Sequence, residues 1–329
     1  MTQTAEAAMK DAIQVRPARA TELSTLAELI KSRLPDMMSS LRRDGTVESH
    51  LARLIPDQAL VIATHQTRLA GLAALDVDRG RILACFLDPE TATPDTPRRL
   101  FAELETRALG FGIRTLGGRA RRRVSGFMRS LGYSCRPATD DDESIETDKD
   151  LLRGADPSIV GILKTCDELG VPEDYGVRHR MAIVPEANEL VAAGIDIFGR
   201  QQKLSPPAAE AFQKMTAAAD GAGIQLKLVS GFRPVVYQAN LVRRKLEAGQ
   251  RISQVLQSSA APGFSEHHSG RAVDLTTHSC KPLQPEFAQT KAYQWLLSNA
   301  RYFGFSESYP RNNRHGINWE PWHWYYHRP

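Results

Sequence analysis

The sequence predicts an α+β protein with two domains, and three features carry this prediction. The chain has 329 residues, which is more than one domain of ordinary size holds. Short alternating strands and amphipathic helices occur in both halves. An acidic run separates these halves. We therefore expect an N-terminal domain at 1–139, an acidic linker at 140–155 and a C-terminal domain at 156–329.

The N-terminal half contains segments with the apolar pattern of strands and segments with that of helices. Alternation of apolar and polar residues predicts strands, and a 3.6-residue period predicts helices. The second and third strands are close enough in sequence to pair as a hairpin. The expected strands are 13–18, 59–64, 68–75, 81–87 and 113–116. The expected helices are 21–33, 97–111 and 124–131.

Charge is distributed in two short clusters. Arg119 and residues 121–123 are basic, and we interpret them as a solvated helix start or as a phosphate contact. No aromatic residues are interleaved with them, so no nucleic-acid partner is expected. The acidic residues at 140–143, with Glu146 and Asp148, are interpreted as a solvated linker. The net charge of +4 is compatible with an anionic peptide or cell-wall partner.

The C-terminal half begins with a helix at 159–169 that ends at Gly170. Ser205 opens another helix, since two prolines occupy its first turn. A strand and two further helices follow. They are expected at 224–229, 235–248 and 290–303. This mixture predicts an α+β domain built on a small antiparallel sheet.

The stretch with the clearest chemistry contains His267 and Asp274. They are seven residues apart, so a flat strand would place them on opposite faces. Gly270 lies between them and permits a turn that resets the direction of the chain. Residues 272–275 then predict a short, partly buried strand that carries the carboxylate.

A second pair of polar residues, Glu320 and His323, lies near the C-terminus. Pro321 makes a long helix unfavourable, so we expect a tight turn that keeps both side chains on one side. Two imidazoles and one carboxylate, with a spare carboxylate beside them, are typical of a catalytic zinc site. We predict that His267, Asp274 and His323 bind one Zn²⁺ and that Glu320 is the general base.

These stretches resemble the VanY/VanX type of zinc D-alanyl-D-alanine carboxypeptidases, which belong to the LAS group of metallopeptidases. Residues 265–274 match the family pattern Ser-x-His-x-x-Gly-x-Ala-x-Asp, and residues 320–323 match Glu-x-x-His. Upstream, residues 230–233 read Ser-Gly-Phe-Arg and Gln238 follows, as in the family. The resemblance covers about 155–329.

The resemblance implies a zinc carboxypeptidase. Its substrates would be stem peptides or muropeptides derived from bacterial peptidoglycan, from which it removes a C-terminal D-amino acid. The bond would be D-Ala–D-Ala or the L,D bond of a tetrapeptide. A catalytically silent zinc-binding interaction module is the alternative.

The resemblance also assigns roles to single residues. Arg233 would stabilise the oxyanion, and the alternative is a surface or capping arginine. Ser265 and Gln238 would hold the terminal carboxylate or the peptide backbone, unless Ser265 caps a turn and Gln238 lies on a helix surface. Trp322 belongs to an aromatic cluster, 319–326, that either packs around the metal turn or forms a wall for the substrate methyl group. His268 is expected to point away from the metal.

Residues 12–138 resemble the GNAT acetyltransferase fold. That family binds the pyrophosphate of acetyl-CoA with a glycine-containing loop whose N–H groups face the phosphate. Here residues 91–98 contain no glycine, two prolines without N–H groups and one aspartate. We therefore expect a degenerate domain that binds an unidentified protein partner or stabilises the chain, with acyl transfer as the alternative.

The remaining features concern the cell compartment. Residues 1–11 have no apolar segment of the kind found in signal peptides, and no run of about 18 apolar residues follows anywhere. The four cysteines have neither metal-binding nor disulfide spacing, so we expect reduced thiols. These observations predict a cytoplasmic protein without a membrane span.

Overall fold

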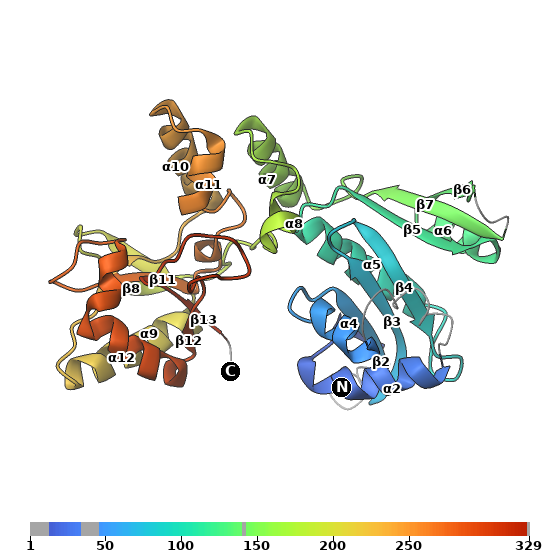
Figure 1. Cartoon of the computed structure of the whole chain (residues 1–329), viewed down its shortest axis with the longest axis horizontal. Helices are drawn as coiled ribbons and strands as arrows, with labels where there is room; N and C mark the ends of the chain where they lie inside the picture. Colours follow the sequence, from blue (N-terminus) through green and yellow to red (C-terminus); the bar gives the residue numbers. More distant parts are fainter. Residues whose placement is uncertain (1–12, 34–45, 140–142, 328–329) are drawn as a thin grey trace, which may run out of the picture. The chain divides into compact units, whose positions relative to one another are not determined.

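The computed structural model describes residues 13–33, 46–139 and 143–327. The chain divides into two compact units, Met1–Ala155 and Asp156–Pro329, and each contains helices and strands (Figure 1). Helices of the described segments are too short or too polar to cross a membrane.

The first unit is built on a seven-stranded mixed sheet in the order β1-β2-β3-β4-β5-β7-β6. Neighbouring strands are antiparallel except β4 and β5, which run parallel and pair only through Arg81 and Ile82. Strands β2 and β3 form the expected hairpin. The strands are β1 (Gln14–Pro17), β2 (Leu60–His65), β3 (Arg68–Asp76), β4 (Arg81–Leu87), β5 (Thr115–Arg121), β6 (Ser134–Pro137) and β7 (Ser144–Asp150).

Helices cover the first half of this sheet. Side chains alternate between the two faces of a strand. Leu60 and Ile62 of β2 therefore share one face, where they pack with α2 and α4, while α5 packs against β2 and β3. The helices are η1 (Ala20–Glu22), α2 (Leu23–Arg33), α4 (Val47–Leu54), α5 (Thr96–Gly110), η2 (Arg122–Val124) and α6 (Ser125–Ser130).

The acidic segment differs from its prediction. Residues 144–150 form strand β7, which pairs with β5 along its whole length and with β6. Ile145 and Thr147 are buried, and Glu146 forms an ion pair of 2.5 Å with Arg81. The linker expected at 140–155 is thus wrong over 144–150, because cross-strand arginines neutralise the outward carboxylates while alternate residues fill the core. Residues 140–142 lie outside the described residues.

The basic cluster also differs from its prediction. Arg119 and Arg121 belong to strand β5, and only Arg122 and Arg123 lie in a helical turn, η2. The cluster is therefore divided between the end of a strand and a short helical turn that leads into α6, so only its second half forms the expected helix start.

The second unit contains a four-stranded antiparallel sheet in the order β10-β11-β13-β12 and a separate hairpin, β8-β9. The small antiparallel sheet was expected, and the hairpin was not. The strands are β8 (Val191–Ile195), β9 (Gln201–Leu204), β10 (Lys227–Ser230), β11 (Ala272–Thr276), β12 (Phe305–Glu307) and β13 (His323–Tyr326).

Two hydrophobic clusters lie on either side of this sheet. One is formed by α9, α12 and inward residues of the strands, and the other by α7, α8, α10 and α11 (Figure 1). The helices are α7 (Pro157–Glu168), α8 (Tyr175–His179), α9 (Pro206–Gly221), α10 (Val235–Glu247), α11 (Ile252–Ser258), η3 (Glu266–Ser269), η4 (Pro285–Gln289), α12 (Lys291–Asn299) and η5 (Ala300–Phe303).

Alternation along β11 and β13 determines where polar groups can lie. Val273 and Leu275 point into the cluster under α9 and α12, as does Trp324 of β13. Asp274 lies between Val273 and Leu275, and His323 directly precedes Trp324. The side chains of Asp274 and His323 consequently point to the opposite face of the sheet. This face carries the candidate site.

Candidate metal centre

Asp274 and His323 are direct cross-strand neighbours. Their backbones are paired in the register of β11 and β13, and residues opposite each other in antiparallel strands place their side chains side by side. Both side chains are buried. The sheet alone therefore brings one carboxylate and one imidazole together, although 49 residues separate them in sequence.

His267 reaches the same point from η3, one turn before β11. Gly270 ends this turn with φ +64°, in the left-handed region that favours glycine. A Cβ atom there would also lie 2.9 Å from the Ser205 nitrogen and 2.9 Å from a methyl carbon of Leu190. The turn expected between His267 and Asp274 is present, and Gly270 is required by both conformation and space.

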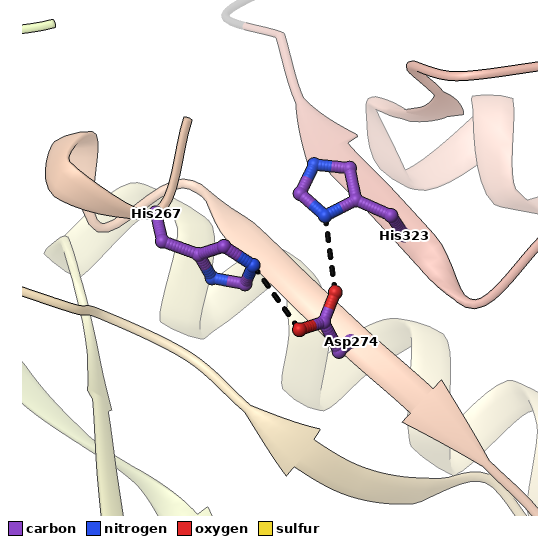
Figure 2. A group of neighbouring side chains, drawn as sticks. All are labelled: His267, Asp274 and His323. Atoms are coloured by element: carbon purple, nitrogen blue, oxygen red, sulfur yellow. Dashed lines mark hydrogen bonds and ion pairs between the residues drawn. The ribbon is translucent and has the colours of Figure 1, made fainter. Parts of the chain in front are cut away.

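The three side chains converge (Figure 2). His267 Nε2 lies 3.2 Å from Asp274 Oδ2, and His323 Nδ1 lies 3.0 Å from Asp274 Oδ1. One candidate ligand atom from each residue lies within 4.8 Å of the others, and all three residues are buried. The geometry therefore presents two nitrogens and a carboxylate to one point.

In each imidazole, the outer nitrogen, which is the one that does not face Asp274, already forms a hydrogen bond. His267 Nδ1 donates to the Gly231 carbonyl at 2.6 Å, and His323 Nε2 donates to Glu266 Oε2 at 2.8 Å. In the neutral imidazoles, the inner nitrogens then carry lone pairs that face the oxygens of Asp274. Either protons on the inner nitrogens or a cation between these atoms satisfies such a set, and metal-binding histidines are oriented in this way by their second hydrogen bond. The donor set fits a metal ion.

The charge distribution agrees with a cation site. Burial alone would raise the pKa of Asp274, but the two histidines outweigh burial and lower the pKa far below its usual value. Burial lowers the pKa of His267. Burial also acts to lower the pKa of His323, yet its hydrogen bonds to Asp274 and Glu266 raise this pKa to about 10. The carboxylates of Asp274 and Glu266 thus favour positive charge at this centre, and a metal ion also supplies positive charge.

Glu320 lies beside this centre on the turn that precedes β13. The His323 N–H donates to the Glu320 carbonyl at 3.0 Å, which closes the expected tight turn. Burial raises the pKa of the Glu320 carboxyl to about 7, and the positive neighbours His323 and Arg233 only partly offset it. A carboxyl with this pKa can accept and return a proton near neutral pH.

Arg233 is fixed at the edge of the centre. Its Nη2 lies 3.6 Å from Asp274 Oδ2 and 3.2 Å from Ser230 Oγ, and its Nη1 donates to Gln238 Oε1 at 3.0 Å. Gln238 is fully buried, and its amide nitrogen donates to the Ala260 carbonyl at 2.7 Å.

Gln238 does not lie on the helix surface, which was the alternative to its predicted role at the substrate. Both ends of its amide are engaged within the protein, and its oxygen holds Arg233 in position. The contact of Gln238 with substrate stays a prediction.

The three candidate ligands open into a cavity of about 390 Å³. Ser265 and Trp322 both line it, in agreement with their predicted place at the site. Within the aromatic cluster, Trp324 and Tyr326 belong to the core instead. The lining residues are Arg233, Leu241, Lys245, Ser258, Ser259, Ala260, Ser265, His267, Asp274, Leu283, Tyr309, Ile317, Asn318, Glu320, Trp322 and His323.

His268 does not face the other imidazoles. Its Nδ1 donates to the Arg233 carbonyl at 2.6 Å, and its Nε2 accepts from the Gly263 N–H at 3.1 Å. Both ring nitrogens are therefore used by the backbone, as expected for a structural histidine.

Two further residues contribute to the centre, and neither was predicted from the sequence. Glu266 was read only as a variable position of the motif, although it orients His323. The Tyr309 ring lies against the His323 ring in a tilted arrangement, with ring centroids 5.0 Å apart and an interplanar angle of 37°. An acidic residue directly before a predicted ligand was the available signal for Glu266. Tyr309 is 14 residues from His323 in the sequence and gave no comparable signal.

Comparisons with known proteins agree with this site. Residues 201–329 match the family described as VanY, D-alanyl-D-alanine carboxypeptidase. The chain is 31% identical over 147 residues to YodJ of Bacillus subtilis (strain 168), which bears a provisional carboxypeptidase name; the match covers 42% of this chain and 53% of YodJ. It is 29% identical over 124 residues to a D-alanyl-D-alanine carboxypeptidase of Enterococcus faecalis (strain ATCC 700802 / V583), covering 35% of this chain and 44% of that protein. The chain thus spans about half the length of these relatives.

Solved structures also resemble parts of the chain. The D,D-pentapeptidase VanY of a VanB-type resistance cassette, solved with Zn(II), is 24% identical with a TM-score of 0.34, covering 44% of this chain and 86% of that chain. An N-acetyltransferase of Thermoplasma acidophilum, solved with coenzyme A, is 18% identical with a TM-score of 0.32, covering 42% of this chain and 99% of that chain.

Proposed function

We propose, from the match of residues 201–329 to the VanY D-alanyl-D-alanine carboxypeptidase family, that the chain is a zinc-dependent carboxypeptidase. Its substrates are peptides derived from peptidoglycan that end in a D-amino acid. The observation that carries the proposal is the convergence of His267, Asp274 and His323 in a cavity that also contains the buried carboxyl of Glu320. Two histidines, one carboxylate and a separate base are the residues that metal-assisted peptide hydrolysis requires.

Zinc bound by these three side chains would lower the pKa of a water ligand towards 7 and polarise the scissile carbonyl. Glu320 accepts the proton of the attacking water, since its carboxyl has a pKa near neutrality and is not one of the three converging ligands. The same carboxyl then returns this proton to the nitrogen of the departing amino acid.

Arg233 supplies positive charge where the carbonyl oxygen becomes negative. Its guanidinium is held by Gln238 and Ser230, so it needs no reorientation when this charge develops. Ser265 and Trp322 line the same cavity and contact the peptide there. Zinc binding, proton transfer and oxyanion stabilisation are thereby assigned to different side chains.

The proposal is tested by metal analysis and amino-acid release. Purified full-length protein is analysed for zinc and incubated with peptides ending in D-Ala–D-Ala and with tetrapeptides whose last bond is an L,D bond. We expect one zinc per chain and chelator-sensitive release of D-alanine, and the cleaved member of the pair identifies the bond. Zinc without release from either peptide would favour the silent binding module. A protein that binds no zinc would contradict the proposal.

We further infer that the first unit is a GNAT-type fold that does not bind acetyl-CoA. Its mixed sheet, with one parallel pair between β4 and β5, and the order of its elements support the fold. The segment Thr91–Arg98, which precedes and opens α5, supports the loss of binding, since it lacks glycine and contains two prolines.

A further inference from the structure

Lys245 is a cationic residue that lines the same cavity as the candidate metal ligands, and its hydrogen bonds within the described residues go only to hydroxyl groups. Lys245 lies in the last turn of α10, and its Nζ donates to Ser259 Oγ at 2.8 Å and to Ser258 Oγ at 3.2 Å. Within the described segments, no carboxylate is in ion-pair contact with this ammonium group. An ammonium has three donors, so one remains available after these two bonds.

The surroundings of Lys245 disfavour an ammonium group that has no anionic partner. Lys245 is partly buried, and burial lowers the pKa of its ammonium group. The negative charge of Glu320 acts to raise this pKa and the positive charge of Arg233 acts to lower it, and both residues line the same cavity as Lys245. A hydroxyl compensates the lost hydration of a cation less well than an anion does. The cavity wall at Lys245 is therefore complementary to a negatively charged group.

The position of Lys245 on α10 shows where it lies relative to the candidate metal centre. Lys245 follows Gln238 by seven residues on α10, which is two helical turns, or about 10 Å along the axis. Gln238 holds Arg233, whereas Lys245 faces the same cavity farther along the helix. The two cations consequently lie at different points of one cavity, and they can bind two different groups of one peptide.

We propose that Lys245, Ser258 and Ser259 form a subsite that binds a carboxylate of the peptide substrate. The inference rests on the proposed function for the nature of the ligand. The carboxylate comes either from the C-terminus of the peptide or from an acidic side chain, and the chemistry of recognition is the same for both. The competing interpretation is that Lys245 only connects α10 to the segment that follows α11.

The experiment compares three peptides of equal length on zinc-loaded full-length protein. The first has a free C-terminus and an acidic side chain, the second has a C-terminal amide, and the third has the side-chain carboxylate converted to an amide. Binding is measured by calorimetry in a Glu320→Gln background, and cleavage is measured with Glu320 intact. Both are repeated with Lys245→Met, Lys245→Arg and the exposed control Lys214→Met, whose ammonium is paired with Glu210.

We expect one of the two amide peptides to bind about 10- to 100-fold more weakly than the acid peptide, as for the loss of a charge-assisted hydrogen bond. This difference should fall below about threefold in Lys245→Met and persist in Lys245→Arg and Lys214→Met. The peptide that shows it identifies the terminal or the side-chain carboxylate. An equal loss for all three peptides in Lys245→Met, or no change, would overturn the subsite.

The two proposals fail in different ways. Discrimination by binding without cleavage would overturn the proposed function and leave the subsite supported. Cleavage that is unaffected by Lys245→Met for every peptide would leave the proposed function supported and overturn the subsite.

Discussion

The carboxyl group of Glu320 has one task in the proposed reaction, which is to transfer a proton. Glu320→Gln keeps the size of the side chain and removes this capacity. We expect kcat to fall by at least about 100-fold. The zinc content should stay at one per chain, because Glu320 is not among the three converging ligands. Amino-acid release and metal analysis measure the two quantities, and Glu247→Gln on the exposed end of α10 is the matched control. Unchanged turnover would remove Glu320 from this role.

Gln238 acts through Arg233, so its substitution should affect catalysis more than zinc binding. In Gln238→Leu the guanidinium loses its acceptor, and we expect kcat/KM to fall about 10- to 100-fold. Gln238→Glu restores an acceptor for Arg233 but not the bond to the Ala260 carbonyl, so it should recover part of kcat. Asn240→Ala, exposed on the same helix, controls for helix effects. Equal activity of the Leu and Glu variants would assign Gln238 a purely structural role.

Those parts of the centre whose residues lie close together in the sequence could be predicted from the sequence. His267, Gly270 and Asp274 lie within eight residues, and their spacing already required a turn followed by a strand. Glu266 and Lys245 were missed because their importance depends on tertiary contacts, with His323 and with the serines after α11. An isolated lysine on an amphipathic helix has the pattern of a solvated face.

Elements were predicted well where burial gives a regular period. Strands β2 and β3 and helix α5 have continuous apolar patterns, and they occur within a few residues of their expected positions. Strand β7 was read as a linker because its outward positions are acidic. The hairpin β8-β9 was missed for a related reason, since most of its residues are exposed and no apolar face is visible in its sequence.

Strand β7 allows a direct test of the corrected boundary. Ile145 is buried between β5 and β6, and Ile145→Ala should lower the free energy of unfolding of the first unit by about 2–5 kcal/mol. Glu143→Ala, at an exposed ion pair next to the strand, should change it by less than about 1 kcal/mol. Urea unfolding measures both variants. Equal, small effects would mean that 144–150 contributes no core.

The segment before α5 predicts the absence of a cofactor. Several of its N–H groups are already used, since Glu90 and Thr91 donate to Asp88 Oδ1, and Thr93 donates to Thr96 Oγ1. Phosphate binding would need free donors at this point. We expect no heat of binding when acetyl-CoA is titrated into the full chain, with an active acetyltransferase as the positive control. A dissociation constant in the micromolar range would restore acyl transfer as a candidate activity.

At the scale of the whole molecule, the three candidate metal ligands belong to one unit only. His267, Asp274 and His323 all lie in Asp156–Pro329, so bound zinc should stabilise this unit and leave Met1–Ala155 unaffected. At a zinc concentration about 1,000 times the dissociation constant, the stabilisation is about 4 kcal/mol, which corresponds to roughly 10 °C for a unit of this size.

We therefore expect calorimetric melting of the full chain to show one transition that falls by about this amount after chelation and another that does not move. His267→Ala should remove the chelator effect, whereas His278→Ala, at an exposed histidine, should keep it. A chelator effect on both transitions would mean that the units unfold together. No effect on either would leave the three converging side chains without the metal that their hydrogen bonds are arranged to hold.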